Sequence, residues 1–305
     1  MMNGYHRLVV ASLTGLLLAS VLGACTGVPA AVDSDQPQVT VSVVPQKYFV
    51  ERIGGDHFAV TVMVEPGGSP ATYEPKPEQL KALSRAVAYF SIGVPFEDVW
   101  LDKIAETNQD MVIVDTIADI ERMPIEEHHH HEEEEDTDHD HAEGAPDPHV
   151  WVSPTLVKVQ SQAIADALVQ LDPDNADDYQ TNLDAFLADI DDLTSEIETE
   201  LAGLENRTFM VFHPSWGYFA HDFGLEQIPV EVGGQEPSAQ ELAALIADAK
   251  GEGIRVVFAQ PEFSTADAET IAEEIGGEVL LVSPLAEDWL GNLRRVAGAF
   301  AEALR

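Results

Sequence analysis

The chain has 305 residues, 45% of them hydrophobic, and it carries 55 acidic against 15 basic side chains, for a formal net charge of −40. That length and apolar content are sufficient for two domains with their own cores. So acidic a surface repels nucleic acid and offers no phosphate-binding face, which excludes nucleic-acid binding.

The first 25 residues predict a secretory signal. Arg7 precedes an apolar run over residues 8–22, and small residues then lead to Cys25, the only cysteine. One cysteine cannot form an internal disulfide, so the alternative is an incidental buried thiol. The segment resembles the lipobox of prokaryotic lipoproteins, which implies acylation of Cys25 and anchoring at the outer face of the membrane. Residues 26–38, rich in Gly, Pro, Ala and Ser, predict a flexible tether.

Strands and helices alternate from residue 39 to residue 116. Predicted strands cover 39–44, 57–64, 87–93 and 111–116, with helices over 45–55, 76–85 and 96–106 between them. This alternation is typical of a parallel sheet covered on both faces. Ligands bind such sheets beyond the carboxyl ends of the strands, so the turn over residues 65–75 is a candidate cleft wall.

Residues 126–145 form a His/acid-rich tract of low complexity that cannot build a core. Its histidines are His128, His129, His130, His131, His139 and His141. Imidazole and carboxylate groups are ligands for zinc and similar ions, so we expect loose metal uptake without one ordered site. A plain solvated charge run would explain the carboxylates but not the histidines.

His149 follows the tract in a short turn between Pro148 and Pro154, which restricts where its ring points. A single histidine is also compatible with a purely structural role. A helix over 155–171 comes next, and residues 174–204 predict one long helix with an apolar stripe every three or four positions. That stripe fits a strut packed across two lobes or, alternatively, a coiled-coil arm.

The second half repeats the alternation of the first. Strands are predicted over 208–213, 225–232, 254–261 and 278–284, and helices over 214–224, 236–250, 264–277 and 285–305. His213 ends the first of these strands, Glu262 follows the third, and Ser283 lies at the carboxyl end of the last. All three are therefore candidate cleft residues.

Several blocks, in this order around the long helix, carry a family resemblance: PATYEPKPEQL (70–80), DPHVW (147–151), FHPSWGYFAHDFGLEQIPVE (212–231), PEFSTADAETIAEEIGG (261–277) and PLAEDWLGNL (284–293). They resemble the ZnuA/TroA-like (cluster 9) zinc and manganese solute-binding proteins of ABC importers. The resemblance implies an α/β fold of two pseudo-symmetric lobes with mainly parallel sheets, bridged by one long helix. We expect lobes over 39–153 and 205–305, with a helical linker over 154–204 and a metal ion between the lobes.

The ligand pattern of that family transfers only in part. His149 and His213 match its second and third ligands, and a histidine at the latter position resembles the zinc members. Ala71 stands where the family has its first histidine, and Ser283 stands where its usual Asp-Pro-Leu supplies a carboxylate. Two imidazoles leave a tetrahedral zinc half-filled. By spacing, Glu74 and Glu262 are the candidates to complete the shell, with a solvated carboxylate as the alternative for each.

These expectations describe an extracytoplasmic receptor rather than an enzyme. It would capture Zn²⁺, or alternatively Mn²⁺ or another divalent ion, and deliver it as a monomer to an ABC permease with its ATPase. The alternatives are a surface metal buffer or sensor that uses the tract, an adhesin of the same fold, and a metallohydrolase, against which the absence of an HExxH motif argues.

Overall fold

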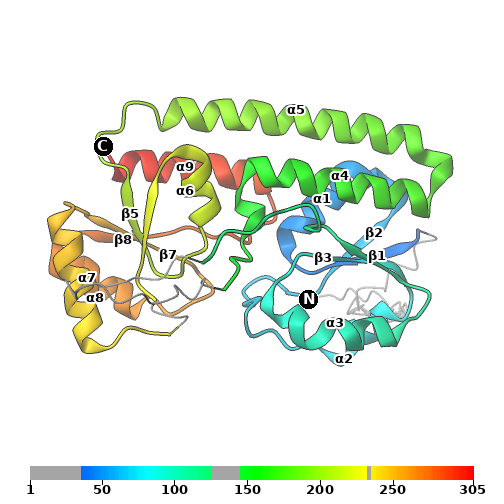
Figure 1. Cartoon of the computed structure of the whole chain (residues 1–305), viewed down its shortest axis with the longest axis horizontal. Coiled ribbons are helices and arrows are strands. Elements are labelled where there is room, and N and C mark those ends of the chain that lie inside the picture. Colours follow the sequence, from blue (N-terminus) through cyan, green and yellow to red (C-terminus); the bar gives the residue numbers. More distant parts are fainter. Residues whose placement is uncertain (1–35, 126–144, 232–234) are drawn as a thin grey trace, which may run out of the picture. The chain divides into compact units, whose positions relative to one another are not determined.

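Two four-stranded parallel sheets organise the chain (Figure 1). A computed structural model describes residues 36–125, 145–231 and 235–305. The first sheet has the order β2-β1-β3-β4 and the second the order β6-β5-β7-β8. The strands are β1 (Gln38–Val41), β2 (Ala59–Val62), β3 (Ala86–Ser91), β4 (Val112–Asp115), β5 (Thr208–Val211), β6 (Glu226–Pro229), β7 (Val256–Ala259) and β8 (Glu278–Leu281). The equal strand orders confirm the predicted pair of pseudo-symmetric α/β lobes.

Helices cover both sheets, as the alternating pattern predicts. They are α1 (Val44–Gly54), α2 (Pro77–Leu83) and α3 (Pro95–Thr107) in the first half, and α6 (Gly217–Phe223), α7 (Ala239–Gly251) and α8 (Ala266–Ile275) in the second. Proline occupies the first turn of α1, α2 and α3, where its missing N–H costs no hydrogen bond. Gly276 ends α8 with φ of 69°, a left-handed conformation that favours glycine.

The long helix α5 (Ala176–Glu200) packs along α4 (Pro154–Leu171), α1 and α9 (Trp289–Ala303) of the same chain. Figure 1 shows it running past helices of both lobes. Its apolar stripe is fully or almost fully buried, at Tyr179, Leu183, Phe186, Ile190, Leu193 and Ile197. The 25-residue helix is shorter than the predicted stretch, since a 3-10 turn, Pro173–Asn175, precedes it and turns follow it. A stripe buried within its own chain makes α5 a strut rather than a coiled-coil arm.

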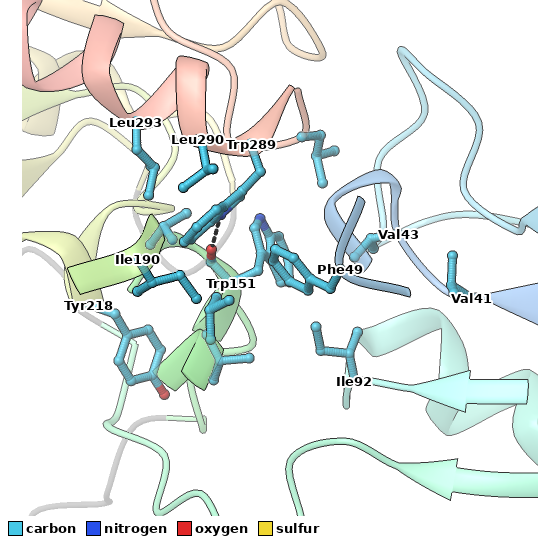
Figure 2. Packing of buried hydrophobic residues seen from close by; sticks show 14 of the residues in the cluster. Val41, Val43, Phe49, Ile92, Trp151, Ile190, Tyr218, Trp289, Leu290 and Leu293 are labelled. Carbon is cyan, nitrogen blue, oxygen red and sulfur yellow. Dashed lines mark hydrogen bonds between the residues drawn. The ribbon is translucent and has the colours of Figure 1, made fainter. Parts of the chain in front are cut away.

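Two tryptophans join the middle of the chain to its end. Trp151 lies in a short 3-10 helix, Val150–Val152, and its indole Nε1 donates to the carbonyl of Pro284 at 2.8 Å. The indole of Trp289 in turn donates to the Trp151 carbonyl at 2.7 Å (Figure 2). Trp289 also packs edge-on against Phe49 of α1, with ring centroids 5.2 Å apart. These contacts tie segments of both lobes to the turn that follows His149.

Among the described helices, none is long and apolar enough to cross a membrane. The secretory signal, Cys25 and residues 26–35 of the tether lie outside the described residues, as do all six histidines of the His/acid-rich tract.

Candidate metal site

His213 lies where the second sheet presents the carboxyl ends of its central strands. It follows β5 by two residues, and the predicted helix at residue 214 begins only at Gly217. The intervening turn is held by the amide of Gln260, which is fully buried after β7. Gln260 Oε1 accepts from the His213 backbone N–H at 3.2 Å, and its Nε2 donates to the His213 carbonyl at 2.7 Å. The backbone of His213 is therefore fixed from the neighbouring strand.

Each of the two candidate histidines is oriented by a buried carboxylate. His213 Nδ1 lies 2.5 Å from Glu231 Oε2, and His149 Nδ1 lies 2.7 Å from Asp147 Oδ1. Both carboxylates are at most 8% exposed. A carboxylate acceptor requires the proton on Nδ1, so it leaves the Nε2 lone pair of each ring free to bind a metal.

The two Nε2 atoms face each other at 3.3 Å. Zinc binds imidazole nitrogen at about 2.05 Å, so two ligands at a tetrahedral angle stand roughly 3.3 Å apart. Two bare lone pairs at this distance repel, whereas a cation between them is attracted to both. His149 and His213 thus have the tautomers and the separation of a pair of zinc ligands.

Burial also favours the neutral form of His213. Removal from water lowers the pKa of His213 below the ordinary imidazole value, because it penalises the charged ring. The Glu231 carboxylate acts in the opposite direction and offsets part of this effect, while His149 adds to the lowering. The neutral imidazole is the form that a metal needs.

Both histidines line one cavity of about 200 Å³. Glu262 also lines it and is the one carboxylate among the described residues that do so. Its Oε1 accepts from the Ser283 hydroxyl at 2.9 Å, while its buried Oε2 has no hydrogen-bond partner. Ala71 lines the cavity too, whereas Glu74 is exposed and does not contribute to it. The structure thus brings Glu262, but not Glu74, to the two histidines.

No third side chain completes the site as it stands. Within residues 36–125, 145–231 and 235–305, no three His, Cys, Asp or Glu side chains come together as metal ligands. A third donor requires that Glu262 move toward the histidines or that a ligand come from elsewhere.

The ends of the His/acid-rich tract meet beside this cavity. The Ile125 N–H donates to the Ala145 carbonyl and the Asp147 N–H to the Met123 carbonyl, each at 2.8 Å. The Tyr218 hydroxyl joins the same two ends, because it accepts from the Met123 N–H at 3.1 Å and donates to the Asp147 carbonyl at 3.0 Å. Ile125 and Ala145 line the cavity, so the tract leaves and rejoins the fold at its rim.

Comparison with known proteins decides the family. A family profile described as "ZnuA: Zinc-uptake complex component A periplasmic" matches residues 39–303. The chain belongs to the ZnuA family. This membership confirms the predicted resemblance. It also confirms that the chain is an extracytoplasmic metal-binding receptor for ABC-type uptake, which is one of the substrate-binding transport proteins.

Three relatives illustrate the breadth of this similarity. The high-affinity zinc uptake system protein ZnuA of Bacillus subtilis (strain 168) is 30% identical over 290 residues, which are 93% of this chain and 90% of that protein. A crystal structure of ZnuA, 48% identical, superposes with a TM-score of 0.82 over 89% of this chain and 100% of that chain. The manganese-binding lipoprotein MntA of Halalkalibacterium halodurans is 26% identical, covering 75% of this chain and 73% of that protein.

Sequence reasoning missed the residues that orient His149 and His213. Asp147 could have been found, because an Asp two positions before His149 forms an Asx turn, in which its Oδ1 accepts the His149 N–H at 2.9 Å. Glu231 and Gln260 gave no local signal. The register of the two strands places Glu231 beside His213. Val211 of β5 pairs with Pro229 of β6, and His213 and Glu231 each lie two residues further along their strands' direction.

Proposed function

We propose that the chain captures zinc in this cavity and that His149 and His213 are its ligands. The observation that carries the proposal is the pair of carboxylate-oriented imidazoles with Nε2 atoms 3.3 Å apart. Imidazole suits zinc, whereas manganese prefers oxygen ligands, so two histidines favour zinc between these metals.

We propose Glu262 as the third protein ligand. Its Oε2 is buried, lies in a residue that lines the cavity, and makes no hydrogen bond. A buried carboxylate oxygen without a partner is costly, and a bound cation would compensate that cost. A metal bond to Oε2 would give that atom a partner, whereas Oε1 already accepts from the Ser283 hydroxyl.

The receptor would work at the outer face of the membrane. We propose that Cys25 is acylated and that residues 26–38 tether the domain near an ABC permease with its ATPase, to which it delivers the metal as a monomer. Support comes from the signal-like first 25 residues and from a relative named as a lipoprotein. The His/acid-rich tract would collect cations beside the cavity, since strong negative charge concentrates them at the surface.

Calorimetric zinc titration tests the cavity separately from the tract. Because the ends of the tract meet by hydrogen bonds at residues 125 and 145, residues 126–144 can be replaced by a short glycine-containing turn. We expect one zinc equivalent in this variant, abolished by His213→Ala and weakened by Glu262→Gln. His221→Ala is the matched control, since the His221 side chain is 72% exposed on α6.

The same titration separates the receptor from the alternative of a surface buffer. Zinc retained by the intact chain but not after replacement of the tract would refute a metal site in the cavity. A titration in which manganese bound the shortened variant more tightly than zinc would contradict the assignment of the metal.

A further inference from the structure

The cavity beside the two histidines is larger and more apolar than a bare ion requires. Its volume is about 200 Å³, whereas a water molecule takes about 30 Å³ of liquid. Its walls are mainly carbon, including Pro70, Ala71, Val94, Pro95, Ile125 and Leu285. Cavities of this character are suited to small organic molecules with a few polar contacts at one side.

Water molecules are poor candidates to complete the metal shell here. With His149, His213 and Glu262 bound, a zinc ion still has an open position. Water on zinc is a strong hydrogen-bond donor and needs acceptors close by. Among the described residues, the wall on the side of Ala71 offers a methyl group, prolines and the Ser69 hydroxyl, which already accepts from the Ala71 N–H at 3.3 Å, and Glu262 is used as a ligand. An organic ligand with an apolar outer face fits this wall better than water does.

The charges near the site restrict what that ligand can be. Asp147, Glu231 and Glu262 place three carboxylates around a cation of charge two. A polyanionic chelator such as citrate would add repulsion in an apolar setting, where uncompensated charge is costly. An α-amino acid bound through its amine nitrogen and one carboxylate oxygen adds a single negative charge and presents its side chain to the wall.

We propose that the protein takes up its metal as a complex with one α-amino acid that has an apolar side chain. The inference rests on the proposed zinc site at His149 and His213. The amino acid supplies the donors that this chain lacks at Ala71, and its side chain fills the apolar part of the cavity. With three protein donors and a chelating pair, zinc is five-coordinate, to which it can expand.

Equilibrium dialysis of the full-length chain with labelled L-leucine tests this proposal. Zinc and leucine are measured with and without each other, and His213→Ala serves as the reference that retains the His/acid-rich tract. We expect about one leucine per protein that depends on both zinc and His213, and glycine held roughly ten-fold or more weakly, because it buries no side chain. Labelled citrate should not be retained in a His213-dependent manner.

Substitution at Ala71 gives a second readout. Ala71→His supplies an imidazole at the open position, so zinc alone should bind at least ten-fold more tightly and leucine retention should fall. Ala71→Leu is the control: it fills the same space without a donor, so it should reduce leucine retention without tightening zinc binding.

The outcomes distinguish this inference from the proposed function. The proposal of an amino-acid complex is refuted if one zinc ion binds in a His213-dependent manner without any leucine, or if leucine and glycine are retained equally. Either result leaves the proposed zinc site intact. Absence of His213-dependent zinc, with or without leucine, overturns both.

Discussion

Glu231→Gln isolates the effect of a carboxylate that never touches the metal. Glu231 Oε2 accepts the Nδ1 proton of His213 at 2.5 Å, and the side chain is only 8% exposed. The amide keeps an oxygen of the same size at this position but removes the negative charge. His213 keeps its place, since Gln260 holds its backbone independently. The variant therefore changes the basicity of His213 Nε2 more than its position.

The expected loss follows from the strength of such partners. Removing a group that orients a metal-binding histidine costs 10- to 100-fold in metal affinity. Because the amide oxygen of glutamine can still accept the Nδ1 proton, we expect the lower end, about ten-fold or roughly 1.4 kcal/mol. The carboxylate also raises the pKa of His213 against the lowering by burial. Its removal lowers this pKa further, so protons should compete with zinc only at lower pH than in the unmodified chain.

Zinc calorimetry between pH 5.5 and 8, on the chain with residues 126–144 replaced, measures both effects. Glu226→Gln is the matched control, because Glu226 is exposed at the opposite end of the same strand and the substitution changes net charge equally. An affinity within two-fold of the unmodified protein at pH 8 would refute the argument that Glu231 tunes the site. So would an equal loss in the Glu226→Gln control, which would assign the effect to net charge.

Three further perturbations test the site and its frame. Zinc affinity of the shortened chain should fall as the pH is lowered from about 7.5 to about 5, because protons compete with the metal for the imidazole nitrogens. Since burial lowers the pKa of His213, most of the loss should occur below the ordinary imidazole pKa of about 6.5; flat calorimetric binding over that range would contradict histidine ligation. Trp289→Phe leaves the buried carbonyl of Trp151 without its indole donor, so it should lower the free energy of unfolding by about 1–3 kcal/mol in urea titrations. Trp100→Phe is the control and should change the free energy of unfolding by less, because Trp100 is partly exposed on α3. Phe186→Ala removes a fully buried ring from α5 and should cost about 3–5 kcal/mol; if Leu187→Ala, at a partly exposed position, cost as much, burial of the stripe would not explain the stability of the strut.

The fold could be predicted from the sequence to a large extent because its signals are local. Alternation of strand and helix sets the parallel sheets, and the spacing of apolar residues over 174–204 sets the buried face of α5. The limits of elements were less predictable. The helix expected from Pro214 begins at Gly217, because Gln260 and Gln227 hold the turn between these residues by hydrogen bonds. Both glutamines come from strand segments that are later in the sequence but adjacent to β5 in the sheet.

The sequence by itself determined which groups could bind a metal. The positions of His149, His213 and Glu262 follow from short motifs at the ends of predicted elements, and their chemistry is that of their side chains. It also indicated the absence of a histidine at Ala71, which leaves the metal shell incomplete. Each of these statements needs only the order of residues along the chain.

Only the tertiary structure decided how those groups meet. Glu231 lies 18 positions from His213, and Gln260 lies 47 positions away, yet all three share one edge of the second sheet. The strand order β6-β5-β7 causes this, since it places the carboxyl ends of β6 and β7 on either side of β5. Glu74 and Glu262 were both candidates by sequence, and the fold separates them because only Glu262 lines a cavity shared with the two histidines. Such proximity depends on register and strand order, which no local pattern encodes.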